Sequence, residues 1–412
     1  MKITHIHIER FRGFQNEDFE VGSQLTAIAG QNGTQKSTLL GIITQTFTLK
    51  TEDSMRVEKP LCGGSYISAF KDKFRLSPTF DKPKGHEWTI SFDAGMDDFT
   101  VESIKRTGDP NVRFWKKGAR QEGDGYISFP TIFLSLKRLV PVAEEAKIIT
   151  DDTLLTQEEL NEFKQLHNKI LIAQTPISSA TTITSKNKQS IGVSTELYDW
   201  NQNSMGQDNL GKIILALFSF KRLHDKYTRQ YKGGILAIDE MDATMYPASQ
   251  VELLKVLRKY ASKLNLQILF TTHSMSLLKA MDDLVQEVTK KEETANQAKI
   301  LYLKKVDDKI AIKQGVNFKG LQLDLNVVAE GNNRKKNRIT AYTEDKENIL
   351  FVKAILKSKA FVLDFVDVTL PCSTLMELVT KRVPAFIYPY SIVILDGDVR
   401  MNKNDLRKIN NA

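Results

Sequence analysis

The stretch G-Q-N-G-T-Q-K-S-T, Gly30 to Thr38, decides the fold. Phosphate-binding loops have the spacing G-x-x-x-x-G-K-[ST], in which backbone N–H groups surround phosphate oxygens. Lys36 and Ser37 fall on that spacing after Gly30, but Gln35 stands where the pattern has glycine. The strand-like run QLTAIAG precedes the loop, and the helix-like run STLLGIITQTF follows it. Strand, loop and helix in this order predict a nucleotide-binding α/β domain.

Composition describes a globular chain of more than one domain. With 412 residues, 41% hydrophobic and 26% charged, the sequence predicts two domains and a soluble protein. It contains no apolar run of about 18 residues, so we expect no membrane span. The opening MKITHIHIERF alternates like a strand and lacks a signal peptide's apolar block. Cys62 and Cys372 are far apart, without a nearby histidine pair, which argues against a zinc module or disulfide scaffold and predicts a cytoplasmic protein.

The formal net charge of +8 leaves two interpretations open. A modest basic excess is commonly a solubility feature. It also suits a nucleic-acid partner, because cationic side chains release the counterions of phosphates. Charge alone does not decide between the two.

Apolar strands alternate with helices through residues 1–330, which predicts an α/β domain with a mostly parallel sheet. We expect strands at 3–11, 24–30, 234–239 and 266–272, and helices from Ser37 and at 156–174, 210–227 and 249–264. Residues 50–135 are typical of a β-rich insertion, and 181–190 (TTITSKNKQS) of a polar, flexible loop. The run GNNRKKNR at 331–338 predicts a linker. A smaller α/β domain at 338–412 follows, with helices at 344–357 and 373–382 and strands at 361–369 and 391–396.

Two carboxylates, Asp239 and Glu240, end the apolar strand GGILAIDE. A carboxylate at the end of a parallel strand can hold Mg²⁺ opposite the Ser37 hydroxyl. A second carboxylate beside it can orient and deprotonate an attacking water. An acidic helix cap, the structural alternative, would not require both carboxylates at that strand end. This pair predicts the hydrolytic part of a nucleotide site.

Two further segments belong with this strand. The next apolar strand ends in FTTHS, so His273 is expected near the same sheet edge, where it can bond a γ-phosphate or the attacking water. A single histidine is more often structural, and that alternative stays open. In NSMGQDNLGKIILAL, Ser204, Gly206 and Gln207 precede a helix, whose positive end attracts anions. Because one chain already has one phosphate loop, we expect this second anion site to serve the nucleotide of another chain.

These four segments in order, together with IERFRGF near the N-terminus, resemble the ABC-type ATPases of the RecF and SMC group over about residues 1–320. The resemblance implies Mg²⁺ held by Ser37 and Asp239, Glu240 as the hydrolytic base and His273 as the γ-phosphate sensor. It implies a signature segment, Ser204 to Gln207, presented across a homodimer, in which Met205 departs from the usual LSGGQ-like pattern. The residues implied to bind ATP in the loop are Gly30, Asn32, Gly33, Gln35, Lys36, Ser37 and Thr38, with Lys36 on the β- and γ-phosphates. Gln35 keeps its backbone N–H, so we expect ATP binding with slow hydrolysis.

The second domain carries its own acids. Glu344 and Glu347 lie in AYTEDKENILFVKAIL and are expected in the first turn of a helix, where helix-dipole stabilisation is the structural alternative. SIVILDGDVR ends in Asp396 and Asp398, which share a face if both lie on a strand. Four gathered carboxylates repel one another unless cations bind between them. Two Mg²⁺ or Mn²⁺ ions could then hold the attacking and leaving oxygens of a phosphodiester.

A glutamate-opened helix followed by a strand with D-x-D resembles a TOPRIM domain. An ABC-type ATPase followed by TOPRIM resembles the OLD family of nucleases, with relatives in bacterial anti-phage defence, including Gabija-type and retron-associated systems. By this resemblance Glu344 and Glu347 match the first acidic motif, and Asp396 and Asp398 match D-x-D. Two features depart from the pattern. Asp345 replaces the usual glycine, and the sequence ends fourteen residues after Asp398, before the family's basic residue.

Lys403, Arg407 and Lys408 are the basic residues that remain after D-x-D. A shortened chain and an incomplete, weakly active domain both fit this ending.

The sequence therefore predicts an ATP-dependent, Mg²⁺- or Mn²⁺-dependent DNA endonuclease of defence systems, in which a homodimeric or larger ATPase assembly controls the nuclease. An accessory defence protein, or a retron-type reverse transcriptase with its nucleic acid, is a further expected partner. The alternative is a non-cleaving, ATP-dependent DNA clamp or sensor with a vestigial acidic site. A topoisomerase or primase relative is a third interpretation, disfavoured because no candidate nucleophilic tyrosine lies in a recognisable helix-turn-helix.

Overall fold

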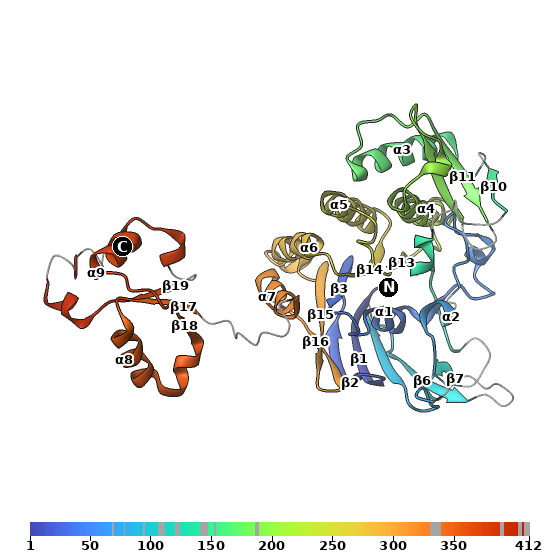
Figure 1. The fold of residues 1–412 in the computed structure, drawn as a ribbon. Coiled ribbons are helices and arrows are strands. Elements are labelled where there is room, and N and C mark those ends of the chain that lie inside the picture. The colour runs from blue at the N-terminus through green and yellow to red at the C-terminus, as the bar shows by residue number, and fades with distance from the viewer. Residues whose placement is uncertain are drawn as a thin grey trace. The chain divides into compact units, whose positions relative to one another are not determined.

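The chain divides into two compact units, Met1–Asn326 (unit 1) and Val327–Ala412 (unit 2) (Figure 1). The computed structural model describes residues 1–67, 70–77, 79–93, 95–105, 112–119, 124–140, 147–151, 154–185, 189–329, 339–387, 391–402 and 406–407. Within these ranges, the side chains of residues 71, 72, 326–329, 358, 359, 361, 398 and 400 are not described. The expected linker at 331–338 lies outside the described residues.

A six-stranded sheet forms the centre of unit 1, in the order β16-β15-β3-β14-β13-β9. Only β16 pairs antiparallel, so the sheet is mostly parallel. Strands β3, β14 and β13 are buried along their whole length, because both sheet faces are covered. The bounds are β16 Lys309–Lys313, β15 Ala298–Val306, β3 Leu25–Gly30, β14 Leu266–Thr272, β13 Gly234–Ile238 and β9 Thr131–Leu134.

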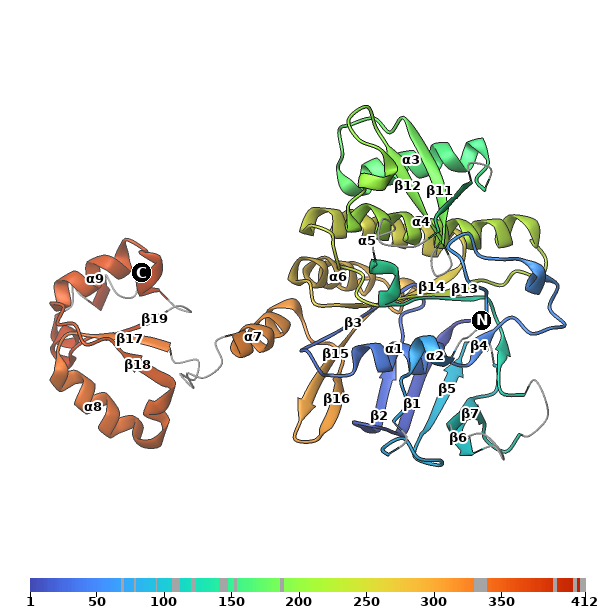
Figure 2. The same cartoon turned by 45° about the vertical axis from the view of Figure 1, so that its right-hand side comes forward.

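Three layers result, with one hydrophobic core on each face of the central sheet (Figure 2). On one face lie the helices α4 Met205–Lys226, α5 Pro247–Lys263 and α6 Met275–Val288. On the other lie α1 Lys36–Thr44 and an antiparallel sheet. The period of two in β3 divides its side chains, so Ala27 joins the first core and Ile28 the second.

The antiparallel sheet has the order β2-β1-β5-β6-β7. The N-terminal region has three strands where we expected two, because FQNEDFE forms β2 after a tight turn and its polar residues face solvent. The insertion is also shorter than 50–135, since TIFL (β9) belongs to the central sheet. The bounds are β1 Ile3–Phe11, β2 Phe14–Glu20, β5 Glu87–Phe92, β6 Phe99–Lys105 and β7 Val112–Lys116, with β4 Phe47–Thr48, β8 Ile127–Ser128 and α2 Phe70–Lys73 nearby in sequence.

The expectation of a flexible loop at 181–190 is wrong at 181–184 and 189–190, which lie in strands, and residues 186–188 are outside the described residues. Strands β11 Ser179–Thr184 and β12 Gln189–Ser194 form an antiparallel hairpin, joined at its edge by β10 Ile149–Asp151. The sequence indicates a loop because these strands are rich in threonine and serine. Even so, β12 is almost wholly buried and packs on α4. Helix α3 Gln157–Leu171 begins with the expected capping box, in which Thr156 and Glu159 bond each other's backbone N–H.

Unit 2 has a three-stranded parallel sheet in the order β18-β17-β19. Its strands are shorter than the sequence suggested, while its helices nearly match. The bounds are β17 Ile339–Thr343, α8 Lys346–Leu356, β18 Leu363–Phe365, α9 Cys372–Thr380 and β19 Ser391–Ile394, with α7 Phe318–Ala329 before them. Among the described helices, none combines the length and apolar character that a membrane crossing needs.

His167 gives this fold a testable acid sensitivity. Its side chain is buried in α3 and neither ring nitrogen has a hydrogen-bond partner among the described residues. Burial lowers its pKa to about 4. Below its unfolded value of about 6.5 the unfolded chain therefore binds more protons, and stability falls by about 3 kcal/mol as pH drops from about 6.5 to 4. We expect His167→Leu to remove this loss and to stabilise the protein near neutral pH.

Urea unfolding at several pH values measures the effect. His167→Gln is the matched control, since it keeps an unpaired buried polar group without titrating. It should remove the acid loss but give no gain near neutral pH. An equal acid loss in wild type and His167→Leu would contradict the assignment.

Candidate nucleotide and acidic sites

The phosphate loop lies between β3 and α1, at the carboxyl edge of the central sheet. Gly30 has φ +152°, and a Cβ there would lie 2.5 Å from the Leu303 carbonyl oxygen, so no other residue fits without displacement. The Lys36 ammonium donates to the carbonyls of Gly30 and Gln31, both at 3.0 Å. Burial lowers the pKa of Lys36, while the nearby Glu240 and Asp239 act in the opposite direction. The loop thus holds a largely buried cation among its own carbonyls.

Gln35 takes the left-handed conformation that normally selects glycine, with φ 62° and ψ 32°. Its amide packs against the turn between β1 and β2: a Cβ on Gly13 would lie 2.9 Å from Gln35 Nε2. The Oε1 atom of Gln35 is buried without a hydrogen-bond partner among the described residues. The substitution therefore keeps the loop's backbone shape. Asn32 and Gly33 in the same loop are exposed.

Ser37 and Asp239 are in direct contact, although 202 residues separate them in sequence. The Ser37 hydroxyl donates to Asp239 Oδ1 at 2.9 Å, and the buried Thr271 hydroxyl donates to the same oxygen at 2.7 Å. The parallel pairing of β3 with β14, and of β14 with β13, puts the three residues at one sheet edge. A hydroxyl and a carboxylate oxygen so placed are ligands of the kind that Mg²⁺ takes. These residues fit a magnesium nucleotide.

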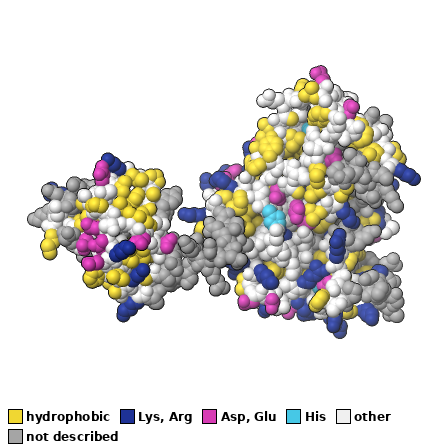
Figure 3. Space-filling view, viewed as in Figure 1, with side chains coloured by type: hydrophobic (Ala, Val, Ile, Leu, Met, Phe, Trp, Pro, Cys, Tyr) yellow, Lys and Arg dark blue, Asp and Glu magenta, His cyan; other side chains and the backbone are white. Residues whose placement is uncertain are grey.

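Glu240 and His273 flank this contact. Glu240 has φ 48°, and its backbone N–H donates to Thr271 Oγ1 at 2.6 Å. The His273 backbone N–H lies 3.4 Å from Asp242 Oδ2. Partial desolvation and the Lys36 ammonium lower the pKa of His273, so its ring is neutral at pH 7. Figure 3 shows acidic side chains beside a histidine near the middle of the visible face of unit 1.

The helix expected from Leu210 begins at Met205, so Gly206 and Gln207 of the predicted signature segment lie inside α4 and not before it. Ser204 is the N-cap and forms a capping box with Gln207, whose amide also donates to the Tyr198 hydroxyl at 2.7 Å. Gly206 is required by close packing, because a Cβ there would lie 2.5 Å from the Thr244 carbonyl oxygen. The start of α4 therefore contacts the loop that follows Asp239 and Glu240.

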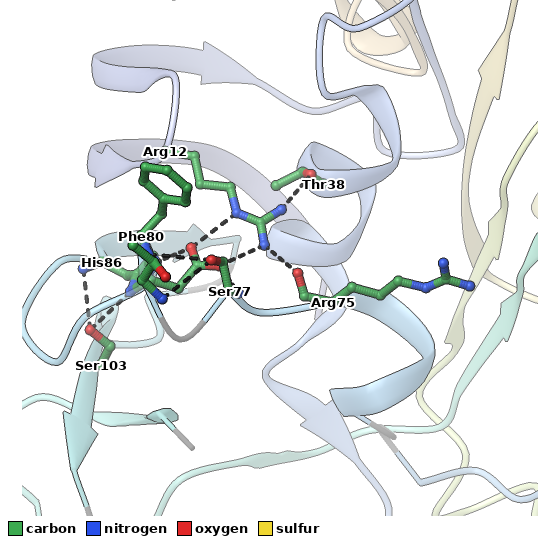
Figure 4. A network of polar contacts seen from close by, with 9 residues as sticks. Arg12, Thr38, Arg75, Ser77, Phe80, His86 and Ser103 are labelled. Atoms are coloured by element: carbon green, nitrogen blue, oxygen red, sulfur yellow. Dashed lines mark hydrogen bonds and ion pairs between the residues drawn. The ribbon is translucent and has the colours of Figure 1, made fainter. Parts of the chain in front are cut away.

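Sequence reasoning missed two arginines. Arg138, in the 3₁₀ helix Leu136–Leu139, is 1% exposed and donates to the Glu240 carbonyl oxygen at 2.8 Å. Arg12, in the turn between β1 and β2, lies 3.5 Å from Thr38 Oγ1 in α1 (Figure 4). No motif marks Arg138, whereas Arg12 stands within IERFRGF, which was recognised only as an opening strand.

Arg12 is held by a buried carboxylate (Figure 4). Asp81 accepts from Arg12 Nε at 3.1 Å and Nη2 at 3.0 Å, and its side chain is 2% exposed. The Ser77 N–H and the His86 ring bond the same carboxylate. Burial alone would raise the pKa of Asp81, but these contacts lower it to about 2.

In unit 2 the expected positions of the acids need correction. Glu344 is not in the first helical turn: it follows β17, Asp345 is the N-cap of α8, and only Glu347 lies in the first turn. Asp396 is not on a strand, because β19 ends at Ile394.

The carboxylate of Asp396 caps the 3₁₀ helix Gly397–Met401, accepting from the Gly397 N–H at 2.6 Å. Asp398 is within that helix, so the alternating-strand argument for a shared face fails. Its side chain is not described.

Glu344 and Asp396 nevertheless follow neighbouring parallel strands. Thr343 of β17 pairs with Ile394 of β19, so both acids leave the same edge of the sheet. Among the described residues, no three Asp, Glu, His or Cys side chains gather as a metal site would need. Of the three basic residues after D-x-D, only Arg407 is described, and it is exposed.

Comparisons with known proteins address unit 1. A family model described as an AAA ATPase domain matches residues 136–278. This range contains the predicted signature segment, Asp239, Glu240 and His273, and the match supports ATP binding and hydrolysis by this part of the chain. No curated protein matches the chain.

Solved structures are similar at low identity. The SMC head domain from Thermotoga maritima has 13% identity and a TM-score of 0.42, covering 77% of this chain and 100% of that chain. An Smc head bound to the C-winged helix domain of ScpA has 14% identity and a TM-score of 0.44, covering 78% and 100%. An Smc head with an extended coiled coil, bound to a ScpA domain from Pyrococcus furiosus, has 12% identity and a TM-score of 0.43, covering 80% and 99%.

The contact of Asp81 with Arg12 gives a testable prediction for stability. We expect Asp81→Asn to cost about 2–3 kcal/mol of stability at pH 7, because Arg12 loses its carboxylate. The pKa of Asp81 is lowered on folding, so its contribution is complete above about pH 4 and is lost as pH falls through about 2. Urea unfolding of wild type and Asp81→Asn at pH 7 and pH 2.5 measures this cost and its pH dependence. A stability difference between wild type and variant that is as large at pH 2.5 as at pH 7 would refute this account.

Proposed function

We propose that this protein is an ATP-binding and hydrolysing, metal-dependent DNA endonuclease, in which a dimer of unit 1 controls a TOPRIM-like unit 2. The observation that carries the ATPase half is the 2.9 Å contact of Ser37 with Asp239, beside the buried Lys36. The nuclease half is supported by Glu344 and Asp396 at one edge of a parallel sheet. It rests on this placement together with the sequence resemblance.

The residues of unit 1 have separate proposed roles in binding and hydrolysing ATP. Lys36 would exchange its two carbonyl contacts for β- and γ-phosphate oxygens, while the N–H groups of the loop and of the start of α1 hold the remaining charge. Ser37 and Asp239 would hold Mg²⁺, which neutralises phosphate charge when bound. Glu240 accepts a proton from the attacking water, and the neutral His273 bonds the γ-phosphate. The strain of Gln35 fits slow hydrolysis.

Dimerisation is supported by the surface around the start of α4. Leu197 is 80% exposed, Tyr246 49% and Met205 42%. Met205 follows the N-cap Ser204, Leu197 precedes Tyr198, which accepts from the Gln207 amide, and Tyr246 lies two residues after Thr244, against whose carbonyl Gly206 packs. Exposed apolar side chains around an anion-binding helix end suit a second copy whose ATP meets Ser204, Gly206 and Gln207.

For unit 2, the proposed substrate is DNA, and the metals are Mg²⁺ or Mn²⁺ held by Glu344, Glu347, Asp396 and Asp398. A role in anti-phage defence, with an accessory protein or a reverse transcriptase as partner, belongs to the same proposal, as does a cytoplasmic location. One observation favours the alternative of a non-cleaving clamp. The described acids of unit 2 do not gather into a metal site by themselves.

The ATPase half predicts separable variant effects. We expect calorimetry with Mg²⁺ to detect ATP binding by wild type and by Glu240→Gln, which keeps the loop intact. Lys36→Ala should lower affinity at least tenfold, because the phosphates lose their buried cation. Glu240→Gln should bind ATP yet hydrolyse it at least 100-fold more slowly, since its amide cannot accept the proton. An absence of ATP binding by folded wild type would end the proposal.

The nuclease half is tested by plasmid cleavage with Mg²⁺ or Mn²⁺. We expect wild type to cut and Asp396→Ala to lose at least 100-fold in rate, through loss of a metal ligand. Asp364→Ala, at the exposed Asp364 of β18, is the control and should cut like wild type. Equal cutting by wild type and Asp396→Ala would indicate contamination, and no cutting by any variant would leave the clamp as the function.

A further inference from the structure

Arg138 is a buried cation that the assignment of the nucleotide site does not use. Its guanidinium donates to Asn209 Oδ1 at 2.7 Å, to the carbonyls of Leu134 and Ser135 at 3.2 and 3.1 Å, and to the Glu240 carbonyl at 2.8 Å. All these acceptors are neutral oxygens. Burial lowers its pKa to about 10, so it stays charged at pH 7. No described residue forms an ion pair with this guanidinium, although the nearby charges of Asp239, Glu240 and Asp242 favour its charged form. These hydrogen bonds and that charge compensate its burial.

Asn209 joins the Arg138 guanidinium to the loop from Glu240 to Thr244. It is 0% exposed, in the second turn of α4. Arginine can only donate, so Asn209 Oδ1 must face Arg138, and this leaves Nδ2 as the donor to the Ala243 carbonyl at 2.9 Å. One side-chain amide thus bridges the buried guanidinium and the loop that follows Glu240. Because Asn209 belongs to α4, the same bridge anchors the helix that begins at Met205.

The bridged loop, Glu240 to Thr244, is strained. Glu240 and Thr244 have φ values of 48° and 68°, in the left-handed region that disfavours residues with a Cβ. Arg138 holds the carbonyl at the start of the loop, and Asn209 holds the Ala243 carbonyl near its end. Gly206 packs against the Thr244 carbonyl. A strained loop keeps its shape only while the surrounding contacts specify it.

From these contacts we infer that Arg138 and Asn209 are a positioning pair that fixes Glu240 to the start of α4, so that engagement of α4 by a second chain's ATP sets the catalytic geometry of the first chain's site. The inference rests on the proposed ATPase function and goes further by naming the residues that transmit the signal. Neither residue is among those proposed to hold the nucleotide. A shift of α4 changes the Ala243 contact directly, and it changes the Glu240 carbonyl contact through the guanidinium.

The pair could instead only support the fold, and the two roles differ in what they change. A structural role changes stability and, with it, ATP affinity and turnover together. A positioning role changes kcat at constant ATP affinity, because Lys36 and Ser37 hold the nucleotide without help from Arg138. It also lowers the steepness with which the rate rises with ATP concentration, since that steepness reports coupling between two chains.

Asn209→Asp is the sharpest test, because it is nearly isosteric. The new carboxylate still accepts from Arg138 but cannot donate to the Ala243 carbonyl or to Thr244 Oγ1, so these hydrogen bonds from α4 to the loop are lost while the packing of Gly206 on Thr244 remains. We expect an unchanged Tm within a few degrees, ATP affinity within twofold of wild type and kcat at least tenfold lower. The Hill coefficient for ATP should fall towards one. Asn161→Asp, on the exposed surface of α3, makes the same charge change and should match wild type.

Arg138→Lys is the second variant, because it keeps a cation but cannot reach both Asn209 and the Glu240 carbonyl. It should show the same loss of kcat at unchanged ATP affinity. Either variant with wild-type kcat overturns the inference, as does a parallel loss of kcat, affinity and Tm. Failure of both variants to fold also overturns it, since the pair would then be structural. If wild type hydrolyses no ATP, the proposed function itself fails, which is a different result.

Discussion

The hydrogen bonds to the carboxylate of Asp239 are the interaction on which unit 1 depends. One oxygen of Asp239, which follows β13, accepts from Ser37 after β3 and from Thr271 near the end of β14, so residues from the same end of three strands meet at one atom. Parallel pairing in the order β3-β14-β13 makes this meeting unavoidable, because the carboxyl ends of all three strands lie at one edge. The carboxylate is 5% exposed, and those donors compensate its burial. A magnesium nucleotide would use the ligands already gathered there.

The three middle strands β3, β14 and β13 could be predicted because they are buried along their whole length and amphipathic helices follow them. The sequence does not predict β15 and β16, and it places β9 in the insertion. The strand at β13 is followed by Asp239 and Glu240, and the loop at Lys36 follows β3, so motif and strand end coincide. The capping box at Thr156 also predicts the start of its helix correctly. In each case one local pattern and the burial it implies point to the same structure, which is the condition for reading structure from sequence.

Two of the failures depend on contacts between distant residues, whereas the failure at Asp396 depends on a local hydrogen bond. The β11–β12 hairpin contains few large apolar residues, and α4 supplies its burial. Arg138 has no motif, because its acceptors are backbone carbonyls and one amide brought together by the fold. Asp396 does not lie on the predicted strand, because its carboxylate accepts from the first N–H of the following helix. This local hydrogen bond competes with strand pairing.

Contacts around the phosphate site explain how a loop without its usual glycine keeps its form although several residues around the site are strained. Arg12, Gln35, Glu240 and Thr244 all have positive φ between 48° and 68°, and each costs about 1 kcal/mol or more. Each strained segment contacts a buried or packed group: Asp81 bonds Arg12, Gly13 accommodates Gln35, and Arg138 and Asn209 bond the loop from Glu240 to Thr244. Because all these contacts come from the chain's own residues, the protein itself specifies the form of the site. ATP binding therefore need not form the loop, and its free energy remains available to change how two chains meet.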